Sequence, residues 1–300
     1  MFSLSTILSA GWKNLKSNPI LLVPGILSAI LSFVFIFAIA WALAGDLDAA
    51  ATTALTSGVD MVTYLNSINF EAFDFGHFFL IFFVALILMF VCSAFIEAGL
   101  TGMVKEAVVT GKTKFGDLFT YGAKYFLRFI LYTILLSLVI GIPIIILAVI
   151  MGFVVSSLTA GTTTIAVVSF LFLLLIFIAA ILLSLFFYFV PYIIIVEDMG
   201  VIDSFKRSYH LFMDNKKNVF VFVLAMVVIN FILLLLTNIL VVVLDFIPVV
   251  GVFIALLVSL IFTSAITALI AAWGIHAFIE LAGKDVIGVA YVEYAEITEE

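Results

Sequence analysis

Three ionisable side chains stand where long apolar segments end, and together they could hold a metal ion or relay a proton. Glu97 follows the apolar residues 78–96, and His276 and Glu280 close the last apolar run. A charge at membrane depth costs about 2.5 to 3.5 kcal/mol, so each one is a functional candidate. His276 and Glu280 lie four residues apart and share a helix face. The favoured interpretation is structural: all three lie half-hydrated at the cytoplasmic interface, where they cap helices or pair with Lys105 and Lys284.

Two asparagines in the fifth apolar segment complete the candidate polar positions. Asn230 and Asn238 could line a polar path or bond a neighbouring helix. Such bonds average below about 1 kcal/mol in membranes, and interhelical bonding is the favoured role. The sequence has no glycine-rich phosphate loop, zinc-spaced cysteine pair, serine elbow or HExxH motif. We therefore predict that the protein is not an enzyme and has no catalytic residue, no metal site and no cofactor.

The elements that would position these side chains are membrane helices. The chain has 300 residues, of which 66% are hydrophobic and 10% charged. A bilayer core of roughly 30 Å needs about 20 apolar residues per helix. Six runs qualify: 20–44, 78–96, 129–155, 165–196, 219–244 and 246–279. None alternates at period two, which excludes a transmembrane barrel. The predicted fold is an all-α polytopic membrane protein with six transmembrane helices.

The distribution of basic residues predicts the orientation of these helices. The net charge is −7, yet all twelve Lys and Arg lie outside the connecting segments 45–77, 156–164 and the turn near Asp245. Basic loops stay on the cytoplasmic side. We predict a multi-pass protein of the cell membrane with both termini cytoplasmic. An acidic chain of this kind is not expected to bind nucleic acid.

Three segments on the basic side combine an apolar and a charged stripe at helical spacing. They are residues 3–17, 114–128 and 201–213, and each is predicted to be an interfacial amphipathic helix on the cytoplasmic side. Each precedes two spans, which indicates a threefold parallel internal repeat. The ends SAFIEAGL (93–100) and HAFIELAG (276–283) share AFIE.

We therefore predict one integral membrane domain, 1–300. Its repeat units are approximately 1–113, 114–200 and 201–300, with an acidic exterior loop at 45–77 and a short cytoplasmic tail at 284–300.

Basic side chains of the three segments could form a collar for lipid headgroups. Lys or Arg beside anionic lipid contributes about 1 kcal/mol. The alternative is that these residues are basic only because they lie on the cytoplasmic side, and that they bind no lipid. The predicted collar consists of Lys13, Lys16, Lys114, Lys124, Arg128, Lys206, Arg207, Lys216 and Lys217.

Proline and glycine interrupt two of the spans. Pro24-Gly25 and Gly141 to Pro143 are expected to kink the first and third helices. Such breaks line binding sites in transporters but are also common in ordinary membrane helices.

The stretch PYIIIVEDMGVIDSFKRSYHLFMDNKKNVF (191–220) and the opening GWKNLKSNPILLVPGI (11–26) carry a family resemblance. The chain resembles proteins related to the membrane domain attached to some bacterial glycerophosphodiester phosphodiesterases, including stand-alone relatives of unknown function. The matching features are Pro191, Glu197, residues 205–209 and residues 215–218. The phosphodiesterase barrel is absent, so the resemblance implies no hydrolase activity.

The leading functional hypothesis is a non-enzymatic membrane protein that organises or handles lipid or a partner membrane protein. The expected partners are membrane lipids, together with another membrane protein or a second copy of the chain. The alternative is a transporter or channel subunit for a small solute or lipid. A third hypothesis, an intramembrane enzyme, would need Glu97, His276 and Glu280 within reach of one another.

Overall fold

A computed structural model describes the whole chain except residues 1, 47–74, 158–161, 246, 248–249 and 284–300. Most of the predicted exterior loop, the predicted tail and Lys284 lie outside the described residues. All the regular structure in the described part is helical. Six helices are long and apolar enough to cross a membrane, which confirms the six predicted spans.

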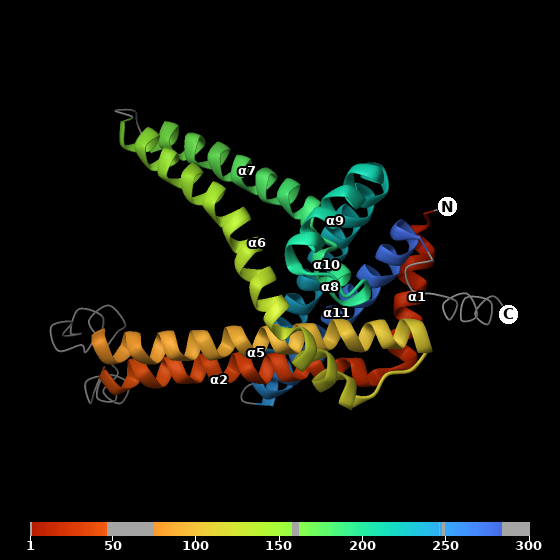
Figure 1. Ribbon diagram of the computed structural model, residues 1–300. Helices are drawn as coiled ribbons and strands as arrows, with labels where there is room; N and C mark the ends of the chain where they lie inside the picture. The colour runs from red at the N-terminus through yellow and green to blue at the C-terminus, as the bar shows by residue number, and fades with distance from the viewer. Residues whose placement is uncertain (1, 47–74, 158–161, 246, 248–249, 284–300) are drawn as a thin grey trace. The chain divides into compact units, whose positions relative to one another are not determined.

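The helices follow one another in a simple order (Figure 1). They are α1 (Leu4–Ser17), the 3₁₀ turn η1 (Pro19–Leu21), α2 (Leu22–Asp46), α5 (Phe75–Thr110), α6 (Phe115–Ser157), α7 (Thr162–Phe187), α8 (Val190–Val196), α9 (Val201–Asp214), α10 (Lys216–Asp245) and α11 (Val250–Ala282).

The second predicted span ends too early. Helix α5 continues past Glu97 to Thr110, a further stretch of about 20 Å at 1.5 Å per residue. It ends at Gly111, whose φ of 76° closes the helix in the left-handed region that glycine adopts without strain. Gly283, with φ 96°, follows the end of α11 in the same way. Glu97 is therefore not at a helix end.

The second predicted interfacial helix is not a separate element. Residues 115–128 form the first turns of α6, a continuous helix of 43 residues. Asp117 accepts hydrogen bonds from the backbone N–H of Lys114 at 2.7 Å and from the hydroxyl of Thr113 at 3.0 Å, so its carboxylate caps the start of α6. The prediction of a separate helix failed because no residue between 115 and 129 ends the helix before the apolar run begins.

The fourth predicted span contains a break. Helix α7 ends at Phe187, and the short α8 starts again at Val190 with Pro191 in its first turn. Proline lacks a backbone N–H and fits the first turn of a helix, where that donor would have no partner. All seven residues of α8 are buried.

Two short helices, α1 and α9, pack on the ends of longer ones. Helix α1 lies along α11, and α9 contacts α7 and α8. The buried side of α9 consists of Val201, Ser204, Ser208 and Leu211. The apolar stripe expected on this helix consists of Ile202, Phe205, Tyr209 and Phe212. It is only partly covered, since Ile202 is 63% exposed and Tyr209 is 42% exposed. Small side chains let α9 approach its neighbours more closely than the large ones would.

The chain divides into two compact units, one of Met1–Ile26 with Ala94–Glu300 and the other of Leu27–Ser93. The second unit holds the described part of α2 beyond Ile26 and the first half of α5. All the polar contacts discussed below belong to the first unit.

Candidate functional site

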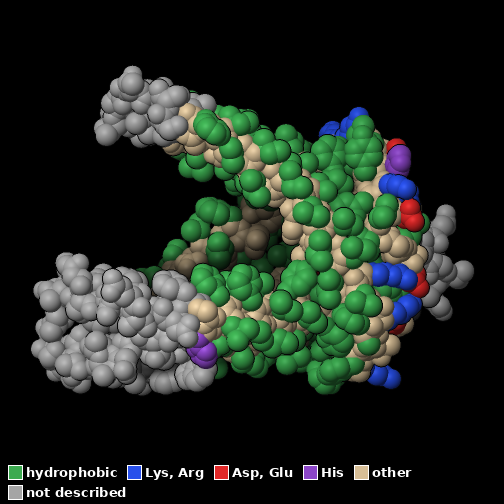
Figure 2. All heavy atoms as spheres, turned by 60° about the vertical axis from the view of Figure 1, so that its left-hand side comes forward, with side chains coloured by type: hydrophobic (Ala, Val, Ile, Leu, Met, Phe, Trp, Pro, Cys, Tyr) green, Lys and Arg blue, Asp and Glu red, His purple; other side chains and the backbone are tan. Residues whose placement is uncertain are grey.

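Charged side chains of the described residues lie close to one another in Figure 2. In Figure 2 the Lys, Arg, Asp and Glu side chains lie together near one edge, while the helices leading away from it carry a hydrophobic surface. The contacts of these charged groups divide them into two kinds: those bonded to the protein itself and those left exposed.

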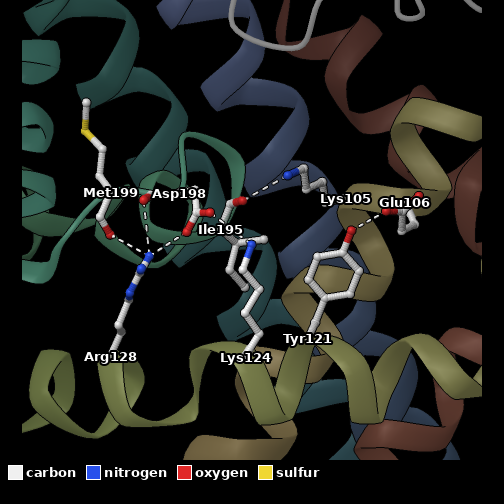
Figure 3. Close-up of polar contacts among 8 residues, drawn as sticks. All are labelled: Lys105, Glu106, Tyr121, Lys124, Arg128, Ile195, Asp198 and Met199. Carbon is white, nitrogen blue, oxygen red and sulfur yellow. Dashed lines mark hydrogen bonds and ion pairs between the residues drawn. The ribbon is translucent and has the colours of Figure 1, made fainter.

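Asp198, in the turn between α8 and α9, is held by two basic residues of α6 (Figure 3). Its carboxylate accepts from Lys124 at 2.9 Å and from Arg128 at 2.6 Å. Arg128 also donates to the carbonyls of Asp198 and Met199, both at 3.2 Å. Asp198 has a φ of 52°, a conformation that Asp tolerates better than most residues. The hydrogen bond from Lys124, with that from Arg128, lowers the pKa of Asp198 to about 2.

Lys105 binds the other side of the same turn. Its ammonium donates to the carbonyl of Ile195 at 3.0 Å, in the last turn of α8, where carbonyls lack helical partners and a cation is favourable. On the same stretch of α5, the carboxylate of Glu106 accepts from the hydroxyl of Tyr121 (Figure 3). Lys105 therefore caps α8, and no ion pair between Lys105 and Glu97 is found in the described chain.

The basic residues of the predicted lipid-headgroup collar fall into the same two kinds, those in ion pairs and those left exposed. Lys124 and Arg128 bind Asp198, and Arg207 lies 3.4 Å from Glu197, so these three side chains hold the fold together. Lys206 makes a looser pair with Asp203 at 3.5 Å. The remaining members are exposed and have no ion pair within the described part of the chain: Lys13, Lys16, Lys114, Lys216 and Lys217.

His276 and Glu280 both bond to the N-terminal segment. Nε2 of His276 lies 3.0 Å from Nδ2 of Asn14 in a buried contact, and the carboxylate of Glu280 accepts from the backbone N–H of Ser3 at 2.8 Å. Trp273, one turn before His276, donates to the carbonyl of Leu8 at 3.0 Å. These contacts fasten α1 to the end of α11, so the role of His276 and Glu280 here is to position α1.

The three ionisable candidates are not joined in one site. Glu97 is exposed on α5, whereas His276 is buried against Asn14. In the part of the chain that the structure describes, no group of three or more His, Cys, Asp or Glu side chains is arranged to hold a metal ion. The hypothesis of a site shared by Glu97, His276 and Glu280 therefore has no structural support.

Asn230 and Asn238 lie on exposed faces of α10. Nδ2 of Asn238 donates to the carbonyl of Leu234 in its own helix at 2.8 Å. No hydrogen bond from either side chain to a neighbouring helix is found in the described chain, so the favoured interhelical role is not observed.

Sequence reasoning missed the polar residues that connect the helices. Asn18 donates to the carbonyl of Gly111 and accepts from the backbone N–H of Thr113, joining the end of α1 to the turn after α5. The hydroxyl of Ser208 donates to the carbonyl of Phe186 at 2.8 Å. The available signal was the Asn-Pro pair at 18–19, since Asn before Pro marks a turn whose side chain can bond backbone groups.

One predicted kink is part of a helix contact. A Cβ atom added at Gly25 would lie 2.5 Å from Cα of Ser264, so α2 and α11 cross almost backbone to backbone there. A Cβ added at Gly141 in α6 would meet nothing within 4 Å. Gly25 therefore permits close packing, as small residues do in membrane helices.

Six apolar helices and a polar edge define a multi-pass helical membrane protein. Residues 78–283 match the family model described as a domain of unknown function (DUF7847), and because this match covers more than half of the chain, the chain belongs to that family. Neither the curated proteins nor the solved structures give a match. The resemblance to the phosphodiesterase-associated membrane domain stays a prediction.

Proposed function

We propose that this protein is a non-enzymatic component of the cell membrane that gathers anionic lipid headgroups against its cytoplasmic side. The observation that carries the proposal is the set of six exposed lysines without an ion pair in the described chain: Lys13, Lys16, Lys112, Lys114, Lys216 and Lys217. Two internal carboxylates, Asp198 and Glu197, pair with Lys124, Arg128 and Arg207, so those residues have less charge to offer to lipid.

The positions of the free lysines favour lipid over a soluble anion. Lys13 and Lys16 share α1 with Trp12, which is 50% exposed, and the ammonium of Lys16 lies 5.7 Å from the Trp12 ring centre. Exposed Trp beside Lys is the usual composition at the headgroup level. Lys216 and Lys217 begin α10, where the chain starts a span.

Charge neutralisation tests the proposal. In lipid nanodiscs of mixed neutral and anionic lipid, we expect the variant Lys13→Gln, Lys16→Gln, Lys216→Gln, Lys217→Gln to lose most of its enrichment of anionic lipid. Each lysine contributes about 1 kcal/mol, so the loss should reach at least roughly tenfold. Native mass spectrometry of retained lipid measures it. Lys206→Gln is the matched control, because Lys206 is already paired with Asp203. Unchanged enrichment in the fourfold variant would reject the proposal.

The proposed orientation places the lysines and both termini in the cytoplasm, because basic residues are absent from 45–77 and 156–164. In a Cys92→Ser background, a membrane-impermeant thiol reagent should label Asp60→Cys in intact cells. The same reagent should label Lys206→Cys only after permeabilisation. The reverse pattern would place the lysines outside and contradict the proposal.

The proposed threefold repeat is supported by one packing pattern. Buried positions recur at spacing four, three, four at 7, 11 and 14 of α1 with Asn18 directly after it, and at 118, 122, 125 and 129 of α6. Helix α9 follows the pattern at 204, 208 and 211. The second position is small each time and lies near an aromatic residue: Gly11 near Trp273, Gly122 near Phe95, and Ser208 bonded to the backbone of Phe186. In each proposed repeat, the amphipathic segment would then pack on the end of a span.

A further inference from the structure

Helix α9 has three different faces around its axis, where the sequence predicts two. At about 100° per residue, Ile202, Tyr209 and Met213 fall within about 40° of one another. They form an open apolar face, since they are 63%, 42% and 39% exposed. The other two faces are a buried one of Val201, Ser204, Ser208 and Leu211, and an exposed polar one of Asp203, Lys206, His210 and Asp214.

The apolar stripe predicted for this helix divides between the protein and the open face. The ring of Phe205 lies 5.0 Å from that of Phe187, and the ring of Phe212 lies 4.7 Å from that of Phe186. These two side chains therefore pack on the end of α7. Tyr209 also stacks on Phe186, at 5.7 Å, but keeps much of its surface open.

Helix α9 crosses the end of α7 instead of running along it (Figure 1). Phe205 contacts Phe187, whereas Ser208 and Phe212 contact Phe186. The contacts extend over about 10 Å of α9 at 1.5 Å per residue, yet they meet two consecutive residues of α7. A helix that crosses a membrane span in this way lies close to the plane of the membrane surface.

Two positions indicate the depth of α9. Phe186 lies about 28 Å along α7 from Val167, the first residue of that apolar span. Because the hydrocarbon core is about 30 Å thick, Phe186 lies close to its boundary with the headgroups. At its other end, α9 is followed by Lys216 and Lys217, which begin α10 and its span. The open apolar face therefore lies at the level where headgroups meet acyl chains.

The surface beside the open face is itself lipid-facing. Ile178 and Leu182 precede Phe186 at spacing four, so the three residues share one side of α7. Ile178 is 46% exposed and Leu182 is 49% exposed, within a span of the membrane protein. The row on which Tyr209 rests thus continues directly into surface that hydrocarbon covers. A water-soluble partner would have to bind at the edge of that hydrocarbon.

We propose that the open apolar face of α9 binds the acyl chains of the adjacent lipid leaflet, while the polar face of the helix stays in water. Amphipathic helices that lie in a membrane interface bury their apolar side in this way, and Tyr is common at that level. The inference goes beyond the gathering of anionic headgroups, because it needs only hydrocarbon and holds equally for neutral lipid.

Nitroxide labels at single cysteines test which face meets lipid. The full-length protein carries Cys92→Ser and is reconstituted in neutral lipid vesicles. Labels at Ile202→Cys and Met213→Cys should collide severalfold more with oxygen, which concentrates in hydrocarbon, than with a water-soluble nickel chelate. Labels at the matched polar positions, Asp203→Cys and His210→Cys, should show the reverse preference. All four side chains are exposed, so the labels should leave the packing of α9 unchanged.

Lipids brominated along the acyl chain test the depth. A fluorescent label at position 202 or 213 should be quenched more by bromine near the glycerol end than by bromine near the methyl end. Leu175→Cys is the control, because Leu175 is exposed on the middle part of α7 and should show the opposite order.

Three results would overturn the proposal. Preference for the nickel chelate at 202 and 213 would place the open face in water. Little collision with either reagent would mean that protein covers it. Oxygen collisions that fall as the protein-to-lipid ratio rises would assign the face to a second copy of the chain. The fourfold lysine variant described above should keep the wild-type pattern, which separates this inference from the proposal on anionic lipid.

Discussion

Replacing Gly99 by valine is expected to push α5 away from the first turns of α6 and to destabilise the protein strongly. A Cβ atom at position 99 would lie 2.5 Å from the backbone carbonyl oxygen of Leu118 and 2.5 Å from its Cδ1. A side-chain atom could rotate away, but a carbonyl inside a helix cannot, so the helix itself must move. Overpacking of a tight contact costs about 1 to 3 kcal/mol, and a backbone obstacle places this site at the upper end or beyond.

Thermal unfolding in detergent measures this effect, with the loss of the monodisperse peak in size-exclusion chromatography as the readout. The matched control is Gly141→Ala in α6, where an added Cβ meets nothing within 4 Å. That change should stabilise the helix slightly, because alanine is favoured over glycine by about 1 kcal/mol in a helix interior. If Gly99→Val unfolds at the same temperature as Gly141→Ala, the close contact between α5 and α6 is incorrect.

The second large effect is expected at the contact between Asn14 and His276. Asn14 is 2% exposed and His276 is 7% exposed, and their side-chain nitrogens lie 3.0 Å apart. Asn14→Leu would leave the imidazole buried without this partner, at a cost of about 1 to 3 kcal/mol. Because the pair fastens α1 to α11, the variant should also expose α1 to proteolysis.

A double-mutant cycle isolates this contact. His276→Leu alone should destabilise the protein, but the double variant should lose less than the sum of the two, with a coupling of about 0.5 to 3 kcal/mol. Asn230→Leu is the control, since Asn230 is exposed on α10 and its replacement should be neutral or stabilising in lipid. Additive effects of the Asn14 and His276 variants would show that the two side chains do not interact.

The sequence by itself determined the class of protein and the number of spans. The hydrocarbon core imposes a length and an apolar composition on every helix that crosses it. Both properties can be read from the sequence without knowledge of any tertiary contact. The runs at 78–96 and 219–244 therefore predicted the helices now seen as α5 and α10. Helix ends were predicted less well, because α5 continues beyond its apolar run to Thr110 and α6 begins at Phe115, before its own run.

Only the tertiary structure decided which partners the polar residues have. Asn14 and His276 are 262 residues apart, and nothing near either one specifies the other. Lys105 was one of two lysines expected as possible partners of Glu97, His276 and Glu280, yet it caps α8, because its ammonium reaches the carbonyl of Ile195 in the last turn of that helix. No ion pair of Glu97 with a lysine is found in the described chain. Local spacing reports which residues share a helix face, whereas the crossing of helices determines what that face meets.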